Sequence, residues 1–142
     1  MILTVTLNAA LDRTLMVPNF LPGRRHRASD ALTLPGGKGV NIARALRSLG
    51  QPVIATGLAG GRTGTAIVEQ LTAEGILNDF VRIGDESRTS TAVVDGTTGQ
   101  QTEINEYGPL VTDAELAVLL EKLGYLSRGA DIVVLAGSLP RG

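Results

Sequence analysis

The chain has 142 residues, 43% of them hydrophobic, which is long enough for one domain with a buried core. Its net charge of -1 shows no basic excess, so electrostatics favours binding to neither nucleic acid nor an anionic membrane. The absence of cysteine excludes structural disulfides and thiolate chemistry.

The chain opens with a predicted buried strand at residues 2–7, a short apolar and β-branched run. Asn8 and Asp12 interrupt this run before it could form a signal or membrane segment, and no basic region precedes it. We therefore expect a soluble, cytoplasmic protein. Residues 13–17 and 25–34 are more polar and lie near prolines and a glycine, which predicts an exposed strand pair that leaves the core.

The next elements alternate between helix and strand. Apolar residues at positions 42, 45, 46 and 49 predict a helix with one apolar stripe, and Gly50 is placed to end that helix. Residues 52–58 predict a buried strand, followed by a helix over about 65–74 that Gly75 ends. This alternation is typical of a parallel sheet with helices on its faces.

The last part of the chain adds short strands and one helix. Residues 80–83, 90–95 and 100–105 are short extended runs, and the turn at 96–99 predicts a hairpin between the last two. Thr112 and Glu115 form a predicted capping box at the start of a helix, with a buried stripe of leucines at 116, 119, 120 and 123. Residues 132–136 predict another core strand.

The loop Pro35-Gly36-Gly37-Lys38-Gly39-Val40-Asn41 is the strongest functional signal. Three glycines allow close approach to a ligand, Lys38 brings a positive charge, and the following helix directs its free N–H groups at the loop, which suits an anion such as a phosphate. Leu32 and Gly39 occupy positions where a P-loop has glycine and Ser or Thr. Ile42 occupies the third glycine position of the dinucleotide fingerprint, so neither nucleotide motif is present.

The loop resembles the ribokinase/PfkB family of sugar kinases, and within it the branch that phosphorylates sugar phosphates. The resemblance covers essentially the whole chain, because further segments fall in the family's order and spacing: residues 6–12, 57–61 with Gly64, 88–89, 102–103 and 137–140. One departure is Ala9, where the family usually has proline. The resemblance implies a three-layer α/β/α sandwich with a small β-sheet lid, formed by about 13–34 and 80–106.

The resemblance also implies roles for individual residues. It assigns sugar or phosphate binding to Asp12, Gly36, Gly37, Lys38, Asn41, Arg88 and Ser138, and it adds Arg25 and Arg27 as basic groups on the lid. From position alone, Asp12 could instead be a turn residue, Asn41 a helix cap, and Lys38 a solvated side chain. Arg25 and Arg27 would share one face of a strand, and that face could simply be solvated. A surface salt bridge is the alternative for Arg88.

The implied activity is transfer of the γ-phosphoryl group of ATP, with Mg²⁺, to a ketohexose phosphate. Fructose 1-phosphate is the first expectation, and tagatose 6-phosphate and fructose 6-phosphate are alternatives. In the family the catalytic base lies in a Gly-Ala-Gly-Asp segment of the second half, so residues 1–142 are expected to be the N-terminal part of one domain, to contain no catalytic base and to be inactive alone. A non-catalytic sugar-phosphate binding module is the competing hypothesis. Relatives imply a homodimer through the lid.

Overall fold

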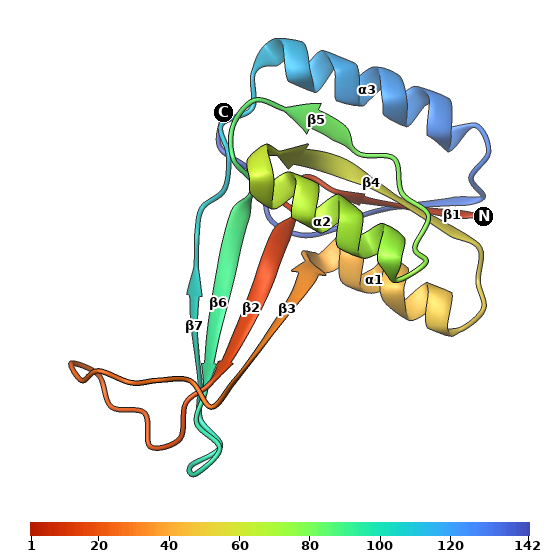
Figure 1. The fold of residues 1–142 in the computed structure, drawn as a ribbon. Helices are drawn as coiled ribbons and strands as arrows, with labels where there is room; N and C mark the ends of the chain where they lie inside the picture. The colour runs from red at the N-terminus through yellow and green to blue at the C-terminus, as the bar shows by residue number, and fades with distance from the viewer.

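The computed structural model describes all 142 residues, which form two sheets and three helices (Figure 1). The central sheet has the strand order β5-β4-β1-β8, and every neighbouring pair is parallel. Its strands are β1 (Ile2–Thr6), β4 (Val53–Gly60), β5 (Val81–Ile83) and β8 (Ile132–Leu135). The apolar, β-branched composition of β1 is what a strand covered on both faces requires, and Leu3 and Val5 are fully buried.

Helices cover both faces of the central sheet, which gives the three layers predicted from the sequence. On one face α1 (Lys38–Ser48) and α2 (Gly61–Ala73) pack on β4 around Val40, Ala43, Ile67 and Leu71. On the other face α3 (Asp113–Ser127) packs on β4 and β5 through Leu119. The capping box of Thr112 and Glu115 is present at the start of α3, as predicted. None of the three helices is long and apolar enough to cross a membrane.

A second, smaller sheet projects from this core (Figure 1). Its strand order is β3-β2-β6-β7, with β2 antiparallel to β3, parallel to β6, and β6 antiparallel to β7. The strands are β2 (Ala10–Met16), β3 (Asp30–Gly36), β6 (Arg88–Val94) and β7 (Gln101–Asn105). The predicted hairpin around residues 96–99 is confirmed by the pairing of β6 with β7.

The boundaries of this small sheet differ from the predicted lid segments 13–34 and 80–106. Residues 81–83 pair with β4 in the central sheet, so the second segment leaves the core only at about Arg88. Val81 and Ile83 are buried in the core cluster of Leu119, and this burial holds the strand in the central sheet. The first segment is longer than predicted, because β2 begins at Ala10 and β3 runs to Gly36.

The apolar stripes predicted for two helices are only partly buried, although both helices are present. In α1 the buried residues are Gly39, Val40 and Ala43, whereas Leu49 is 74% exposed. Because Gly39 and Ala43 are small, this side of α1 can approach β1 closely, and it is therefore the side of the helix that is buried. In α3 Leu119 is buried and Leu123 is partly buried, but Leu116 and Leu120 are exposed, because one side of the helix alone meets the sheet.

Candidate functional site

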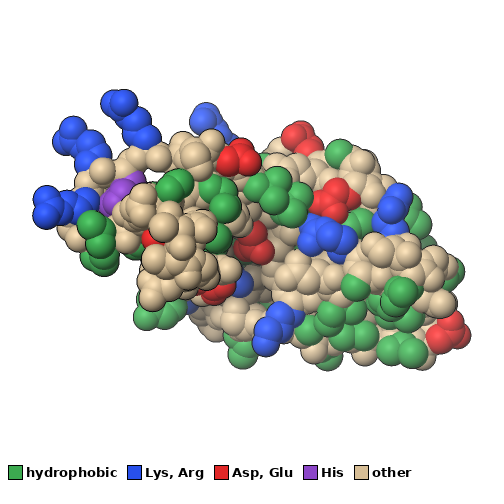
Figure 2. All heavy atoms as spheres, turned by 90° about the horizontal axis from the view of Figure 1, so that it is seen from below, with side chains coloured by type: hydrophobic (Ala, Val, Ile, Leu, Met, Phe, Trp, Pro, Cys, Tyr) green, Lys and Arg blue, Asp and Glu red, His purple; other side chains and the backbone are tan.

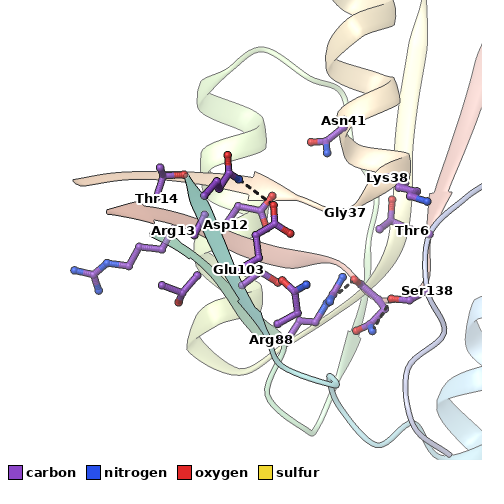
Figure 3. Close-up of a pocket in the computed structure, with 17 residues that line it drawn as sticks. Thr6, Asp12, Arg13, Thr14, Gly37, Lys38, Asn41, Arg88, Glu103 and Ser138 are labelled. Atoms are coloured by element: carbon purple, nitrogen blue, oxygen red, sulfur yellow. Dashed lines mark hydrogen bonds between the residues drawn. The ribbon is translucent and has the colours of Figure 1, made fainter. Parts of the chain in front are cut away.

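A polar hollow of about 390 Å³ lies where the second sheet meets the core (Figure 3). It is bounded by the carboxyl end of β1, the start of α1, one face of the second sheet and the loop after β8. Only one of its 17 lining residues is hydrophobic, so it suits a hydroxyl-rich or charged ligand better than an apolar one. The lining polar side chains include Thr6, Asn8, Asp12, Thr14, Lys38, Asn41, Arg88, Ser90, Gln101, Glu103, Asn105 and Ser138.

The glycines of the 36–39 loop make room for other side chains of this site. A Cβ on Gly36 would overlap the Asp12 carboxylate, and one on Gly39 would overlap the Thr6 hydroxyl. Gly37 has a φ of 105°, which favours glycine, and its Cβ would lie 2.7 Å from Thr6 Cγ2. Gly37 lines the hollow, whereas Gly36 acts by allowing the Asp12 carboxylate to pack against the backbone.

Asp12 lies in β2, so it is a strand residue and not a turn aspartate. Burial raises the pKa of its carboxyl above the ordinary value, the charges of Arg88 and Arg44 act in the opposite direction, and Glu103 adds to the rise. No protein group donates a hydrogen bond to this carboxylate. Asp12 therefore presents free acceptor oxygens to the hollow, as binding of sugar hydroxyls requires.

The start of α1 supplies positive potential to the same hollow. Gly37 is the N-cap, no side chain caps the helix, and no acidic residue lies in its first turn. The first N–H groups of α1 therefore have no side-chain partner from the cap. Lys38 is exposed and takes part in none of the three ion pairs of the structure. Lys38 and the helix N-terminus are thus available to an anion.

Arg88, at the start of β6, joins the second sheet to the core. Its Nε donates to the carbonyl of Asn8 at 3.1 Å, and its Nη1 donates to the carbonyl of Glu106 at 3.4 Å. Arg88 forms no surface salt bridge, which was the alternative from position alone. Its guanidinium has five donors, so donors remain for a ligand in the hollow.

Asn8 and Ser138 close the core side of the hollow. Asn8 is 3% exposed, and its Nδ2 donates to the carbonyl of Tyr107 at 2.9 Å and to Ser138 Oγ at 3.1 Å. Its Oδ1 is buried without a hydrogen-bond partner. The side chain thereby ties the end of β1 to the segment after β7 and to the loop after β8.

Arg25 and Arg27 lie outside this hollow. Residues 25–28 form no strand, so the two side chains do not share a strand face, and both are exposed in the β2–β3 loop at the far end of the second sheet. Figure 2 shows basic side chains around the single histidine at this tip. Within one copy of the chain, these arginines do not reach the site.

The structure adds site residues that the sequence did not single out. Gln101, Glu103 and Asn105 of β7 all face the hollow, and Gln101 Nε2 donates to Glu103 Oε1 at 2.9 Å. Their alternation along one strand was the available signal. The sequence does not show that β7 pairs with β6, on the same face of the sheet as Asp12.

The described residues include no cluster of three or more side chains that could hold a metal ion. Lys38, Arg88 and the start of α1 supply positive charge to the hollow. Its second sheet contributes the carboxylates of Asp12 and Glu103 (Figure 3).

Comparison with known proteins places this arrangement in a family. The chain matches the description "pfkB family carbohydrate kinase" over residues 3–142. It belongs to the pfkB family. This PfkB chain is also similar to a Thermotoga maritima protein described as a possible 1-phosphofructokinase, with 39% identity and a TM-score of 0.94. That match covers 100% of this chain and 46% of the Thermotoga chain.

Phosphofructokinase-2 from Escherichia coli, solved in complex with fructose-6-phosphate, is a second similar structure. It shares 33% identity with the PfkB chain and has a TM-score of 0.92, over 98% of this chain and 46% of that one. A further structure of the same enzyme is described as its tetrameric inhibited form. The PfkB chain thus spans about half the length of these relatives, and the fold predicted from the sequence is confirmed.

Proposed function

We propose that this chain forms the acceptor-sugar side of an ATP-dependent kinase that phosphorylates a ketohexose phosphate. Fructose 1-phosphate is the first substrate to test, with tagatose 6-phosphate and fructose 6-phosphate as alternatives. The main support is one observation: the unpartnered Asp12 carboxylate and the free Lys38 ammonium line the same polar hollow. A sugar that already carries a phosphate needs both kinds of group.

In this proposal the chain's residues bind and orient the acceptor. Asp12 accepts hydrogen bonds from sugar hydroxyls, while Lys38, Arg88 and the first N–H groups of α1 neutralise the phosphate. Phosphoryl transfer depends largely on such positioning and charge neutralisation. ATP supplies the phosphoryl group and Mg²⁺ accompanies it.

The catalytic base is the second part of the proposal. We assign it to a Gly-Ala-Gly-Asp segment expected beyond Gly142.

We also propose a cytoplasmic location, which would give the enzyme access to ATP, and a homodimer through the second sheet. In this dimer Arg25 and Arg27 could reach a partner's site.

One experiment separates the kinase from a non-catalytic binding module. The gene is sequenced beyond Gly142, and the 142-residue chain and the complete gene product are assayed with ATP and each of the three sugar phosphates. The kinase proposal predicts a continuing frame with Gly-Ala-Gly-Asp, turnover by the complete product and none by the 142-residue chain. A stop codon after Gly142, together with sugar-phosphate binding but no turnover, would establish the module instead.

A further inference from the structure

Arg44 is a partly buried arginine behind the site, and it joins three parts of the structure: α1, β3 and the end of α2. Its Nε and Nη2 donate to the two carboxylate oxygens of Glu74, at 2.7 and 3.0 Å. Nη2 also donates to the carbonyl of Pro35 at 2.7 Å, and Nη1 donates to Asn41 Oδ1 at 3.0 Å. The side chains of Arg44 and Glu74 are 28% and 25% exposed, so the pair is shielded from much of the solvent.

The chemistry of the guanidinium decides how the Asn41 amide is turned. Arginine has donors and no acceptor, so Asn41 must present its carbonyl oxygen to Arg44. The Asn41 Nδ2 group forms no hydrogen bond within the protein, and Asn41 lines the hollow (Figure 3). Two N–H donors are therefore left for a ligand oxygen, such as one of a phosphate.

Arg44 also holds the backbone that leads into the glycine loop. The carbonyl of Pro35 immediately precedes Gly36 and Gly37, and Arg44 fixes its direction from the next helix. Glu74, the C-cap residue of α2, in turn holds the guanidinium with both carboxylate oxygens. Neither Arg44 nor Glu74 lines the hollow. Arg44 can therefore affect a ligand through Asn41, through the loop, or through the action of its charge on Asp12.

We propose that Arg44, clamped by Glu74, is a positioning residue that sets Asn41 as a hydrogen-bond donor toward the acceptor's phosphate. This inference rests on the proposed function. It adds a determinant of specificity to that function: the orientation of the Asn41 amide is fixed by the Arg44–Glu74 ion pair, which lies outside the site. A side chain at position 41 with the same shape but no N–H donors would keep the contact with Arg44 and lose the hydrogen bonds to the ligand.

The sharpest variant is therefore Asn41→Asp in the complete gene product. The new carboxylate can pair with Arg44 and lies in the first turn of α1, where negative charge is favourable, so the melting temperature should not fall. The KM for the sugar phosphate should rise about tenfold or more, since a donor to an anion is replaced by a like charge, while the KM for ATP stays unchanged. An unchanged sugar-phosphate KM would overturn the inference.

A double-mutant cycle tests whether Arg44 acts through Asn41. Arg44→Ala should raise the sugar-phosphate KM about tenfold in the parent enzyme and much less in an Asn41→Ala background. Arg47→Ala is the matched control, because Arg47 also ties α1 to the end of α2, through the carbonyl of Gly75 at 2.9 Å, but touches neither Pro35 nor Asn41. It should leave the sugar-phosphate KM unchanged. Equal KM effects in both backgrounds would contradict the proposed route.

A direct readout separates failure of this inference from failure of the proposed function. If the parent phosphorylates none of the three sugar phosphates, the function is wrong, and the amide is followed by NMR instead. The Asn41 side-chain amide should be ordered in the parent, disordered in Arg44→Ala and unaffected in Arg47→Ala. Equal order of the amide in the parent and in Arg44→Ala would overturn the positioning role, whatever the ligand is.

Discussion

At the scale of single residues, Asp12 carries a cost in stability that its proposed role explains. Burial raises the pKa of its carboxyl, so the folded protein binds a proton more readily at this site than the unfolded chain does. The contribution of Asp12 to the free energy of unfolding therefore falls as the pH rises from the pKa of the unfolded chain through the higher pKa of the folded protein. At neutral pH the ionised carboxylate destabilises the folded protein. The proposed binding of sugar hydroxyls by Asp12 explains why a destabilising carboxylate is present at this position.

Asp12→Asn in the complete gene product should separate the two effects. Sugar kcat/KM should fall by about tenfold to a hundredfold, because hydroxyl groups lose a charged acceptor, while the KM for ATP stays nearly constant. The melting temperature at neutral pH should be equal to or above that of the parent, and any gain should vanish in acid. Steady-state kinetics and thermal melts at several pH values measure both. An unchanged sugar kcat/KM would remove Asp12 from the site.

Lys38 is the cleanest test of the cationic side of the hollow, because no ion pair of the protein depends on it. Lys38→Ala should raise the KM for the sugar phosphate about tenfold, and activity on free fructose, if any, should barely change. The chain's other lysine, Lys122, forms an ion pair with Asp79 away from the hollow, and Lys122→Ala serves as the control. A preference of the parent for free fructose over every hexose phosphate would contradict the charge assignment.

At the scale of elements, Asp95 connects two loops by hydrogen bonds at the end of the second sheet that lies away from the core. Asp95 is 4% exposed, and its carboxylate accepts backbone hydrogen bonds from Asn19 and Phe20, both at 3.0 Å, and from Thr97 at 2.9 Å. Burial pushes the pKa of Asp95 upward, but these backbone donors outweigh it and hold the pKa below its ordinary value. The carboxylate thus ties the loop after β2 to the β6–β7 turn.

The lowered pKa fixes the sign of the expected pH dependence. Stability from Asp95 is present above the unfolded pKa and is lost as the pH falls through the lower, folded value. Asp95→Asn should therefore lower the melting temperature at neutral pH and increase hydrogen exchange of the Asn19 and Phe20 amides. The difference from the parent should shrink in strong acid. An equal melting temperature at neutral pH would show that the tie contributes nothing.

At the scale of the whole molecule, the second sheet and the central sheet both leave apolar side chains uncovered. Leu32 of β3 is 56% exposed and pairs with Thr14, so it extends the same face of the sheet that lines the hollow. On the central sheet, Ile132 and Leu135 of the edge strand β8 are 55% and 69% exposed. Exposed apolar surface at two sheets is a typical feature of faces that meet other protein segments.

The proposed dimer can be tested on the second sheet. Leu32→Glu in the complete gene product should convert a dimer to a monomer, because a charge would be buried against the partner, and light scattering after size-exclusion chromatography gives the mass. Leu77→Glu is the control, since Leu77 is 69% exposed but lies outside the second sheet. A dimer that survives Leu32→Glu unchanged would place its interface elsewhere.

The family, the alternation of strands and helices, and the glycine loop with Lys38 and Asn41 could be predicted from the sequence, because local periodicity and a contiguous motif carry these features. Three other features became evident only from the packing of distant segments: which face of α1 is buried, that residues 81–83 join the central sheet, and that Arg25 and Arg27 lie outside the hollow. The same is true of the placement of Glu103 in one hollow with Asp12 and of the ion pair between Arg44 and Glu74. These depend on contacts between distant segments, and no local pattern records which strands and helices will meet.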